Sequence, residues 1–407
     1  MTGCLTGLRV LDLSRVLAGP WAGQIFADLG AEVIKVERPD VGDDTRGWGP
    51  PFLVDQEGRE TSEAAYFLSC NRGKKSITID IRNPDGQDLV RKLAAKSDFL
   101  LENYKVGGLA KYGLSYQHLR KLNPGLIYCS ITGFGQDGPY KDRAGYDFMI
   151  QAMGGLMSVT GLPDGMAGAG PVKVGVAITD LFTGMYATVA MLAALEHRRR
   201  TGEGQWIDLS LLDVQVATLA NQALNYLTSG DVPRRLGNAH PNIAPYEAFP
   251  TSDGYMILAV GNDDQFSRFC SAAGRPDLSK DPRFATNSGR VENRRALIPQ
   301  VAAVLAQHPT NHWLEMLEIA RVPCGPINAL DRVFKDPQVK HRRMCVSASH
   351  AAAGKVGLVA SPIKFSNTPV ADPKAPPLLG EHTDEILADL LGISRDRIEV
   401  LRTQGSI

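Results

Sequence analysis

Apolar and polar positions in the first 130 residues alternate between two periods. Short runs rich in Val, Ile and Leu are separated by stretches with helical periodicity, near residues 20–30, 85–96 and 115–122. The apolar runs predict strands at 9–13, 32–36, 76–79, 99–102 and 126–130. Strands that alternate with helices form a parallel sheet covered on both faces. We therefore predict an α/β fold with a Rossmann-like, doubly wound parallel sheet.

The remaining chain predicts further elements of both kinds. A Gly- and Pro-rich stretch, 161–171, predicts a mobile loop before a long apolar helix that runs to about residue 199. A strand (205–209) and a helix (211–228) follow, and the pattern then becomes that of a smaller α+β domain, with a strand at 254–261 and helices at 263–273, 292–307 and 309–320. The chain ends with strands near 344–348 and 355–361, a Pro-rich stretch and helices at 382–391 and 394–404.

These patterns divide the chain into four parts. We predict a large Rossmann-like domain (1–200), a linker (201–229), a small α+β domain (230–325), and a second linker that returns to the large domain (326–407). The 407 residues are long enough for two substantial cores.

Charge and cysteine content narrow the class of protein. Lys and Arg together number 44, as do Asp and Glu, so no excess charge points to nucleic acid or a membrane surface as partner. The six cysteines are scattered without a C-x-x-C pair, which favours reduced thiols. We find neither a secretory N-terminal pattern nor an apolar run of membrane-spanning length. We expect a soluble, cytoplasmic protein.

Asp180 stands directly ahead of the long apolar helix and is the main candidate for chemistry. Free backbone N–H groups and the dipole of a helix N-terminus favour a negative charge there. Such an aspartate is expected to stay ionised and to serve as a nucleophile. The alternative is an ordinary helix N-cap.

The turn after the first strand lacks the G-x-G-x-x-G pattern of dinucleotide-binding domains. The second strand ends in Glu37-Arg38, and a guanidinium at this edge suits a ribose that carries a phosphate. NADP and coenzyme A are therefore the candidate ligands. A surface salt bridge would account for Arg38 equally well.

Several ordered blocks carry a specific resemblance: LDLSRVLAGP (11–20), LGAEVIKVER (29–38), GDDTRGWGP (42–50), NRGKKS (71–76), ENY (102–104), SITGFGQDGP (130–139), RAGYD (143–147) and LLGEHTD (378–384). Together they resemble the class III CoA-transferase family, which includes formyl-CoA, carnitine and succinyl-CoA-dependent transferases and α-methylacyl-CoA racemases. The resemblance implies that Asp180 attacks the acyl-CoA thioester, that coenzyme A is a substrate, and that no cofactor is tightly bound.

By the same resemblance, the coenzyme A groove is lined by Val16, Leu17, Ala18, Arg38, Ile79, Asp80, Ile81, Arg82, Asn103, Tyr104, Lys105, Lys111, Ala144, Gly145, Tyr146 and Asp147. Some relatives have Gln in place of Leu17 and Arg in place of Lys111. A lysine neutralises a phosphate but lacks the bidentate fork of arginine.

Tyr146 argues for acyl transfer rather than racemisation. The racemases have a histidine in an A-G-H-D motif, and this chain has A-G-Y-D. Tyrosine, with a pKa of about 10, is a poor general base near neutral pH. The implied mechanism passes through an acyl–aspartyl anhydride and an aspartyl-CoA thioester, with backbone N–H groups to hold the oxyanion. No histidine spacing supports a metal site.

Residues 42–51 and 235–246 are most similar to the branch that uses succinyl-CoA with glutarate or hydroxymethylglutarate. A dicarboxylate needs donors for its distal carboxylate, and we assign Arg15, Arg46 and His240 to that role in the substrate pocket. Trp48 is expected to close the pocket over the acyl chain. The alternatives are that both arginines pair with Asp12, Asp43 or Asp44 and that His240 orders a turn. Formate or oxalate, carnitine, malate and itaconate-type acids remain open as substrates.

The family's subunits form an interlocked, ring-like homodimer, and the resemblance implies the same assembly for this chain. A racemase or epimerase is the other enzymatic reading of the sequence. A non-catalytic acyl-CoA binder is a further alternative, against which Asp180 argues.

Overall fold

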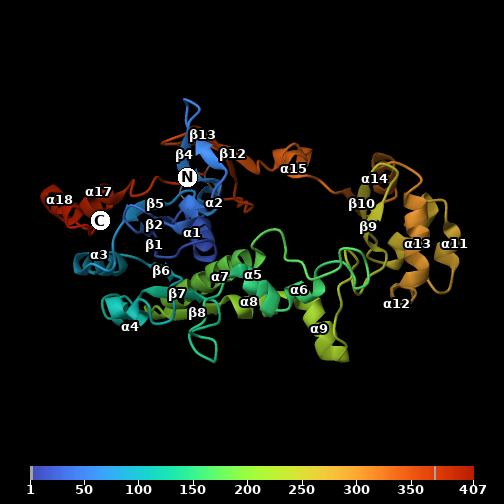
Figure 1. Ribbon diagram of the computed structural model, residues 1–407, viewed down its shortest axis with the longest axis horizontal. Helices are drawn as coiled ribbons and strands as arrows, with labels where there is room; N and C mark the ends of the chain where they lie inside the picture. Colours follow the sequence, from blue (N-terminus) through green and yellow to red (C-terminus); the bar gives the residue numbers. More distant parts are fainter. Residues whose placement is uncertain (1–2, 371–372) are drawn as a thin grey trace. The chain divides into compact units, whose positions relative to one another are not determined.

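A computed structural model describes residues 3–370 and 373–407 (Figure 1). The first two residues and residues 371 and 372 of the predicted second linker lie outside this description. The chain divides into two compact units. The first contains residues up to 154, 175–218 and those from 337 on, and the second contains 155–174 and 219–336. The Gly- and Pro-rich stretch 161–171 therefore belongs to the second unit.

Six strands of the described residues form the central sheet of the first unit, in the order β5-β2-β1-β6-β7-β8. They are β1 (Arg9–Asp12), β2 (Glu32–Glu37), β5 (Lys75–Thr78), β6 (Phe99–Glu102), β7 (Ile127–Thr132) and β8 (Trp206–Ser210). Every neighbouring pair is parallel. In chain order this is 3-2-1-4-5-6, the order of doubly wound dinucleotide-binding sheets. The predicted parallel sheet is confirmed.

The sheet has an apolar core on each face. On one face, Val10 and Phe99 pack with Phe26 of α1 (Ala18–Asp28) and Met191 of α7 (Ile178–Thr201). On the other, Leu11 and its neighbours pack with α3 (Pro84–Ala95) and with α18 (Arg395–Thr403) near the C-terminus. Because both faces are covered, the inner strands β1, β6 and β7 are almost fully buried, whereas the edge strand β8 alternates between exposed and half-buried positions over residues 206–209.

α7 departs from the expectation that the chain has no apolar run of membrane-spanning length. In the described part of the chain it is the single helix long and apolar enough to cross a membrane by length and composition. Ala187, Met191 and Ala194 are nonetheless fully buried against the sheet and α1. α7 is thus a core helix of the first unit.

Shorter elements complete the first unit. They are η1 (Asp44–Gly47), β3 (Phe52–Val54), β4 (Glu60–Ala64), α2 (Ala65–Cys70), η2 (Ala110–Tyr112), α4 (Tyr116–Leu119), α5 (Asp147–Met153), α8 (Leu211–Thr218), α16 (Pro337–His341), β12 (Cys345–His350), β13 (Gly354–Val359), α17 (Thr383–Glu385) and η3 (Ile386–Leu390). The hairpins β3–β4 and β12–β13 are antiparallel.

The second unit is a small α+β structure. An antiparallel sheet, β11-β10-β9, consists of β9 (Tyr246–Pro250), β10 (Tyr255–Ala259) and β11 (Cys324–Pro326). Its helices are α6 (Leu156–Val159), α9 (Ala220–Ser229), α10 (Asp263–Ala272), α11 (Pro276–Lys280), α12 (Asn287–Glu292), α13 (Arg294–Leu305), α14 (Thr310–Ile319) and α15 (Leu330–Val333). Phe249, Met256, Phe266, Leu297 and Trp313 form its core.

The predicted helix 211–228 is wrong in one respect, because the structure divides it into α8 and α9. Ala220 at the break has a left-handed backbone, with φ of 47°. The division between the two units falls at the same place.

Candidate active site

Two adjoining cavities lie at the carboxyl ends of the central strands. The first, here the Asp180 cavity, has a volume of about 210 Å³ and is lined by residues 15–18, 103–106, 131–133 and 141–146 with Asp44, Asp180 and Leu211. The second, here the Arg38 cavity, has a volume of about 370 Å³ and follows β2, β5 and β6. Arg15, Tyr104 and Lys105 line both cavities. Strand order reverses between β1 and β6, and ligands of doubly wound sheets bind at that point.

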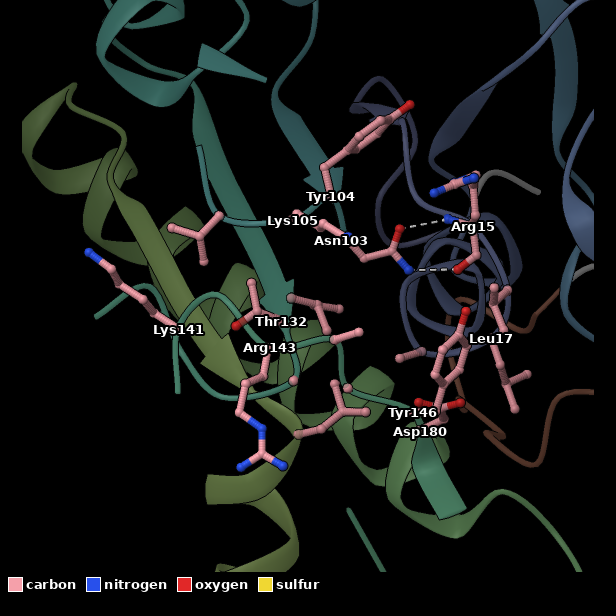
Figure 2. A pocket seen from close by; sticks show the side chains of 18 of the residues that line it. Arg15, Leu17, Asn103, Tyr104, Lys105, Thr132, Lys141, Arg143, Tyr146 and Asp180 are labelled. Carbon is pink, nitrogen blue, oxygen red and sulfur yellow. Dashed lines mark hydrogen bonds between the residues drawn. The ribbon is translucent and has the colours of Figure 1, made fainter. Parts of the chain in front are cut away.

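The turn after β1 forms one wall of the Asp180 cavity and has a strained backbone. Val16 has φ of 71°, a left-handed conformation that is rare for a β-branched residue. Hydrogen bonds hold the turn in place. The Val16 N–H donates to the carboxylate of Asp43, and Asn103 accepts from the Arg15 N–H (2.9 Å) and donates to the Arg15 carbonyl (2.7 Å) (Figure 2).

A buried ion pair between Lys35 and Asp43 supports this turn. The Lys35 ammonium bonds to the Asp43 carboxylate (2.8 Å) and to the Ser14 carbonyl (2.9 Å), and both charged side chains are fully buried. Burial alone would raise the pKa of Asp43, but the charge and hydrogen bond of Lys35 hold it at about 2. Asp43 therefore stays ionised, and the pair fixes the cavity wall.

The turn after β6 is fixed by a buried carboxyl group. Glu102 accepts from the Tyr104 N–H at 2.8 Å. Burial raises the pKa of Glu102 to about 7. This turn carries Asn103, Tyr104 and Lys105 into the cavities.

Asp180 lies in the first turn of α7 and lines the cavity at its base. The N-cap residue of α7 is Ala177, so a carboxylate from another helix takes the capping role. Asp147 of α5 accepts from the Thr179 N–H at 2.8 Å and from the Asp180 N–H at 3.3 Å. Burial, together with the charge of Asp147, raises the pKa of Asp180 to about 7. The first N–H groups of α7 therefore donate to Asp147, and the helix start does not lower the pKa of Asp180 as the sequence analysis expected.

A close contact between α7 and the start of α1 fixes the position of Asp180. A Cβ on Gly184, one turn after Asp180, would lie 2.6 Å from the Ala18 carbonyl oxygen. Only glycine therefore permits this approach of α7 to the start of α1.

Two tyrosines flank Asp180. Tyr146 is 66% exposed and lines the same cavity, where Figure 2 shows it near Asp180 and Leu17. Tyr66 of α2 was missed by the sequence analysis. Burial and the nearby charge of Asp180 raise the pKa of Tyr66 to about 12.

The Arg38 cavity is rich in unpaired cations. Arg38, Lys105 and Lys111 line it, and none of these three forms an ion pair with the described residues. Arg82, by contrast, donates two hydrogen bonds to the Asp80 carboxylate, at 3.0 and 2.7 Å. Three free cations in one depression suit a ligand with several phosphate charges.

Comparison with known proteins is consistent with this geometry. The sequence profile of CoA-transferase family III matches residues 5–383. The chain belongs to CoA-transferase family III. It is accordingly an enzyme that transfers CoA groups, with acyl-CoA as a substrate.

Curated relatives and a solved structure extend this match over nearly the whole transferase. This chain is 52% identical to the succinate–glutarate CoA-transferase of Agrobacterium fabrum, over 96% of each chain. It is 46% identical to the succinyl-CoA:glutarate CoA-transferase of Mus musculus, over 99% of this chain and 90% of the relative. A crystal structure of a CAIB/BAIF family protein from Brucella suis matches with a TM-score of 0.83 and 52% identity, covering 96% of this chain and 100% of the other.

Most residues predicted to line the transferase's coenzyme A groove do line one of the two cavities. Val16, Leu17, Ala18, Asn103, Ala144, Gly145 and Tyr146 line the Asp180 cavity, and Arg38, Ile79, Asp80, Ile81, Arg82 and Lys111 line the Arg38 cavity. Tyr104 and Lys105 line both. Asp147 is different, because its carboxylate contacts α7 rather than the cavity.

Of the four residues predicted for the substrate pocket, Arg15 lines the Asp180 cavity and Arg46, Trp48 and His240 do not. Arg15 lines the Asp180 cavity and pairs with Asp44 at 3.2 Å, as the alternative interpretation had it. Arg46 is buried away from the cavity and paired with Glu37 and Glu63, partners that the sequence analysis did not name. Trp48 is 43% exposed and packs edge-on against Tyr66, with ring centroids 5.1 Å apart.

His240 lies in the second unit, where it orders a turn. Its Nδ1 accepts from the Asn242 N–H at 3.1 Å, and Arg294 donates to its carbonyl. Burial, with the nearby Arg294, lowers the pKa of His240.

Several residues of the Asp180 cavity were missed by sequence reasoning, and three of them carry polar side chains beside the motifs: Thr132, Lys141 and Arg143. All three stand inside or beside motifs that carry the family resemblance, which is the signal that marks them. Arg143 lies over the rings of Phe134 and Tyr140, at 5.2 and 4.6 Å from their centroids.

The described residues contain no group of three or more His, Cys, Asp or Glu side chains placed to hold a metal ion. All six cysteines are free thiols, as the sequence analysis expected.

Proposed function

We propose that this enzyme moves coenzyme A from succinyl-CoA to a short dicarboxylate, with glutarate as the first acceptor to test. The proposal is supported by relatives named succinate–glutarate and succinyl-CoA:glutarate CoA-transferases, at 52% and 46% identity. The observation that carries it is the position of Asp180 in a cavity that adjoins three unpaired cations.

The mechanism begins with attack by the Asp180 carboxylate on the thioester carbonyl of succinyl-CoA. A C–O bond forms, the C–S bond breaks, and coenzyme A leaves as a thiolate. The thiolate then attacks the Asp180 carbonyl of the mixed anhydride. Succinate departs, and Asp180 holds coenzyme A as a thioester.

The acceptor reverses these steps. Its carboxylate attacks the Asp180 thioester and releases the thiolate, which then attacks the acceptor carbonyl of the new anhydride. The products are the acceptor's CoA thioester and a free Asp180 carboxylate. Backbone N–H groups in the first turn of α1, at Ala18 and Gly19, are the proposed donors to the oxyanion of each step.

Racemisation is the second candidate reaction, and the cavity disfavours it. None of the described residues that line the Asp180 cavity is a histidine. By the resemblance to the racemases, Tyr146 stands where those enzymes have their histidine, and phenols are poor bases near neutral pH.

Two measurements test the proposed function. Asp180→Ala is expected to abolish exchange between succinyl-CoA and glutarate while the Kd for CoA changes little. Hydroxylamine added during turnover is expected to modify Asp180 of the unsubstituted enzyme. Turnover by Asp180→Ala, or α-deuterium uptake from deuterated water into a 2-methylacyl-CoA without any acceptor acid, would refute the proposal.

We further propose that the enzyme is a homodimer and that it is cytoplasmic. Phe182, Met185, Tyr186 and Val189 follow the i, i+3, i+4, i+7 spacing of one helix face on α7, and all four are at least 42% exposed. Such a contiguous apolar face suits contact with a second copy. Sedimentation equilibrium is expected to give twice the chain mass, and a folded, active monomer on dilution would contradict this.

A further inference from the structure

We propose that Asp147 is the positioning residue of this active site. Its carboxylate caps the first turn of α7 in place of a cap from that helix's own sequence, and this leaves the Asp180 side chain facing the substrate cavity. The inference rests on the proposed function, in which Asp180 is the nucleophile. It goes beyond that function because Asp147 does not line the cavity.

The hydrogen bonds of Asp147 connect α5 to the catalytic turn. One carboxylate oxygen accepts from the N–H groups of Thr179 (2.8 Å) and Asp180 (3.3 Å), and the other accepts from the Gln151 amide at 2.6 Å. The turn is also fixed from α8, because the buried Thr179 hydroxyl donates to the Gln215 amide oxygen at 2.6 Å. The backbone on both sides of the Asp180 Cα is therefore fixed by side chains of other helices.

Because Asp147 caps α7, the Asp180 carboxylate does not have to accept from the first-turn N–H groups. An aspartate in the first turn commonly stabilises that turn through its own charge. Here Asp147 already accepts from the first-turn N–H groups, and Asp180 is spared that role. Since Asp147 follows directly on Ala144, Gly145 and Tyr146, one short segment provides both the cavity wall and the cap.

A second consequence is electrostatic. Asp147 places a negative charge close to Asp180, which adds to the effect of burial. Tyr66 on α2 is affected by the charge of Asp180, and the other titratable or charged groups that line the Asp180 cavity are Arg15, Asp44, Tyr104, Lys105, Lys141, Asp142, Arg143 and Tyr146. A carboxylate destabilised in this way is a better nucleophile than one fully stabilised by a helix start.

Two variants separate the cap from the charge. Asp147→Asn keeps an oxygen that accepts from the Thr179 N–H but removes the negative charge. The low-pH limb of its kcat/KM profile, with succinyl-CoA and glutarate, is expected to move to lower pH because the charge of Asp147 raises the pKa of Asp180. Asp147→Ala removes both, and its kcat is expected to fall roughly 10- to 100-fold with little change in the Kd for CoA.

Asp137→Asn is the matched control, an exposed acid ahead of α5 that does not line the cavity, and it is expected to match the unsubstituted enzyme. If Asp147→Ala does not fold, the pH profile of Asp147→Asn decides. An unchanged profile in Asp147→Asn would overturn the inference, as would an unchanged kcat in folded Asp147→Ala.

Asp180→Ala, measured in parallel, separates this inference from the proposed function. Turnover by Asp180→Ala overturns both. An inactive Asp180→Ala beside Asp147 variants that behave like the control overturns the role of Asp147 alone.

Discussion

Replacing Arg46 with methionine tests whether this residue binds substrate, as its sequence context suggests, or holds the fold. Its guanidinium bonds Glu37 through two nitrogens, each at 2.8 Å, bonds Glu63 at 2.9 Å, and donates to the Pro377 carbonyl at 3.1 Å. It also lies 3.7 Å from the centre of the Phe67 ring. Arg46, Glu37 and Glu63 are at most 6% exposed.

The expected cost follows from leaving two buried carboxylates without the Arg46 guanidinium, with only the more distant Lys35 charge near Glu37. Removing one partner of a buried pair typically costs 3–5 kcal/mol, and methionine keeps most of the stem over Phe67. We expect Arg46→Met to lose about 3–5 kcal/mol of unfolding free energy. The KM for glutarate of the folded variant should stay within about twofold of the unsubstituted value, because Arg46 does not line the Asp180 cavity.

Urea unfolding followed by circular dichroism, together with initial rates below the unfolding midpoint, measures both quantities. Burial alone would raise the pKa of Glu37, but the hydrogen bond from Arg46 and the charge of Lys35 hold it below its ordinary value. Without Arg46 that stabilisation of the anion is lost, so the stability deficit should shrink as the pH is lowered and Glu37 and Glu63 take up protons.

The control is Arg59→Met, which removes a 73%-exposed arginine from its pairs with Asp55 and Glu57. Its cost should stay below about 1 kcal/mol. A stable Arg46→Met with a strongly raised KM for glutarate would refute the structural role of Arg46 and restore the substrate role.

Three further predictions concern other parts of the site. Gly184→Ala should lower both stability, by about 1–3 kcal/mol, and kcat, because the added methyl group would meet the Ala18 carbonyl 2.6 Å away; thermal melts and initial rates measure these, and full activity would contradict the packing argument. Glu102→Gln should gain stability relative to the unsubstituted enzyme as the pH rises from 4.5 to 8. The Glu102 carboxyl has a pKa of about 7 in the fold against an ordinary 4.5, so the fold loses roughly 3 kcal/mol over that range; urea midpoints at both pH values measure the difference, and equal differences at the two pH values would exclude this effect. Arg38→Ala should raise the KM for succinyl-CoA about tenfold or more and leave that for glutarate nearly unchanged, while equal effects on both would argue against phosphate binding in the Arg38 cavity.

Much of the fold was predictable because its signals are local. The inner strands β1, β6 and β7 are almost fully buried, and each is a short, mostly apolar run that the sequence displays directly. The break between α8 and α9 has no such signal, since Ala220 adopts a left-handed backbone that neither Gly nor Pro marks. Tertiary structure alone imposes it.

The candidate site divides in the same way. Motif segments next to strand ends line the cavities as expected, because parallel strands bring their carboxyl ends to one edge. The partners of Arg46 were not predictable, since Asp43 and Asp44 are nearer in sequence than Glu37 and Glu63. The cap on α7 was equally hidden, because Asp147 and Thr179 are 32 residues apart.

The same sheet order that holds a dinucleotide in other doubly wound proteins places Asp180 at the cavity here, and the first turn explains the difference. A glycine-rich turn lets a pyrophosphate approach the start of the first helix. In this chain Val16 fills that turn in a strained conformation, and α7 packs against the start of α1 through Gly184. The start of α1 therefore faces Asp180, and the unpaired cations gather beyond β2 and β6. A ligand whose phosphates lie at one end and whose reacting thioester lies at the other matches this separation.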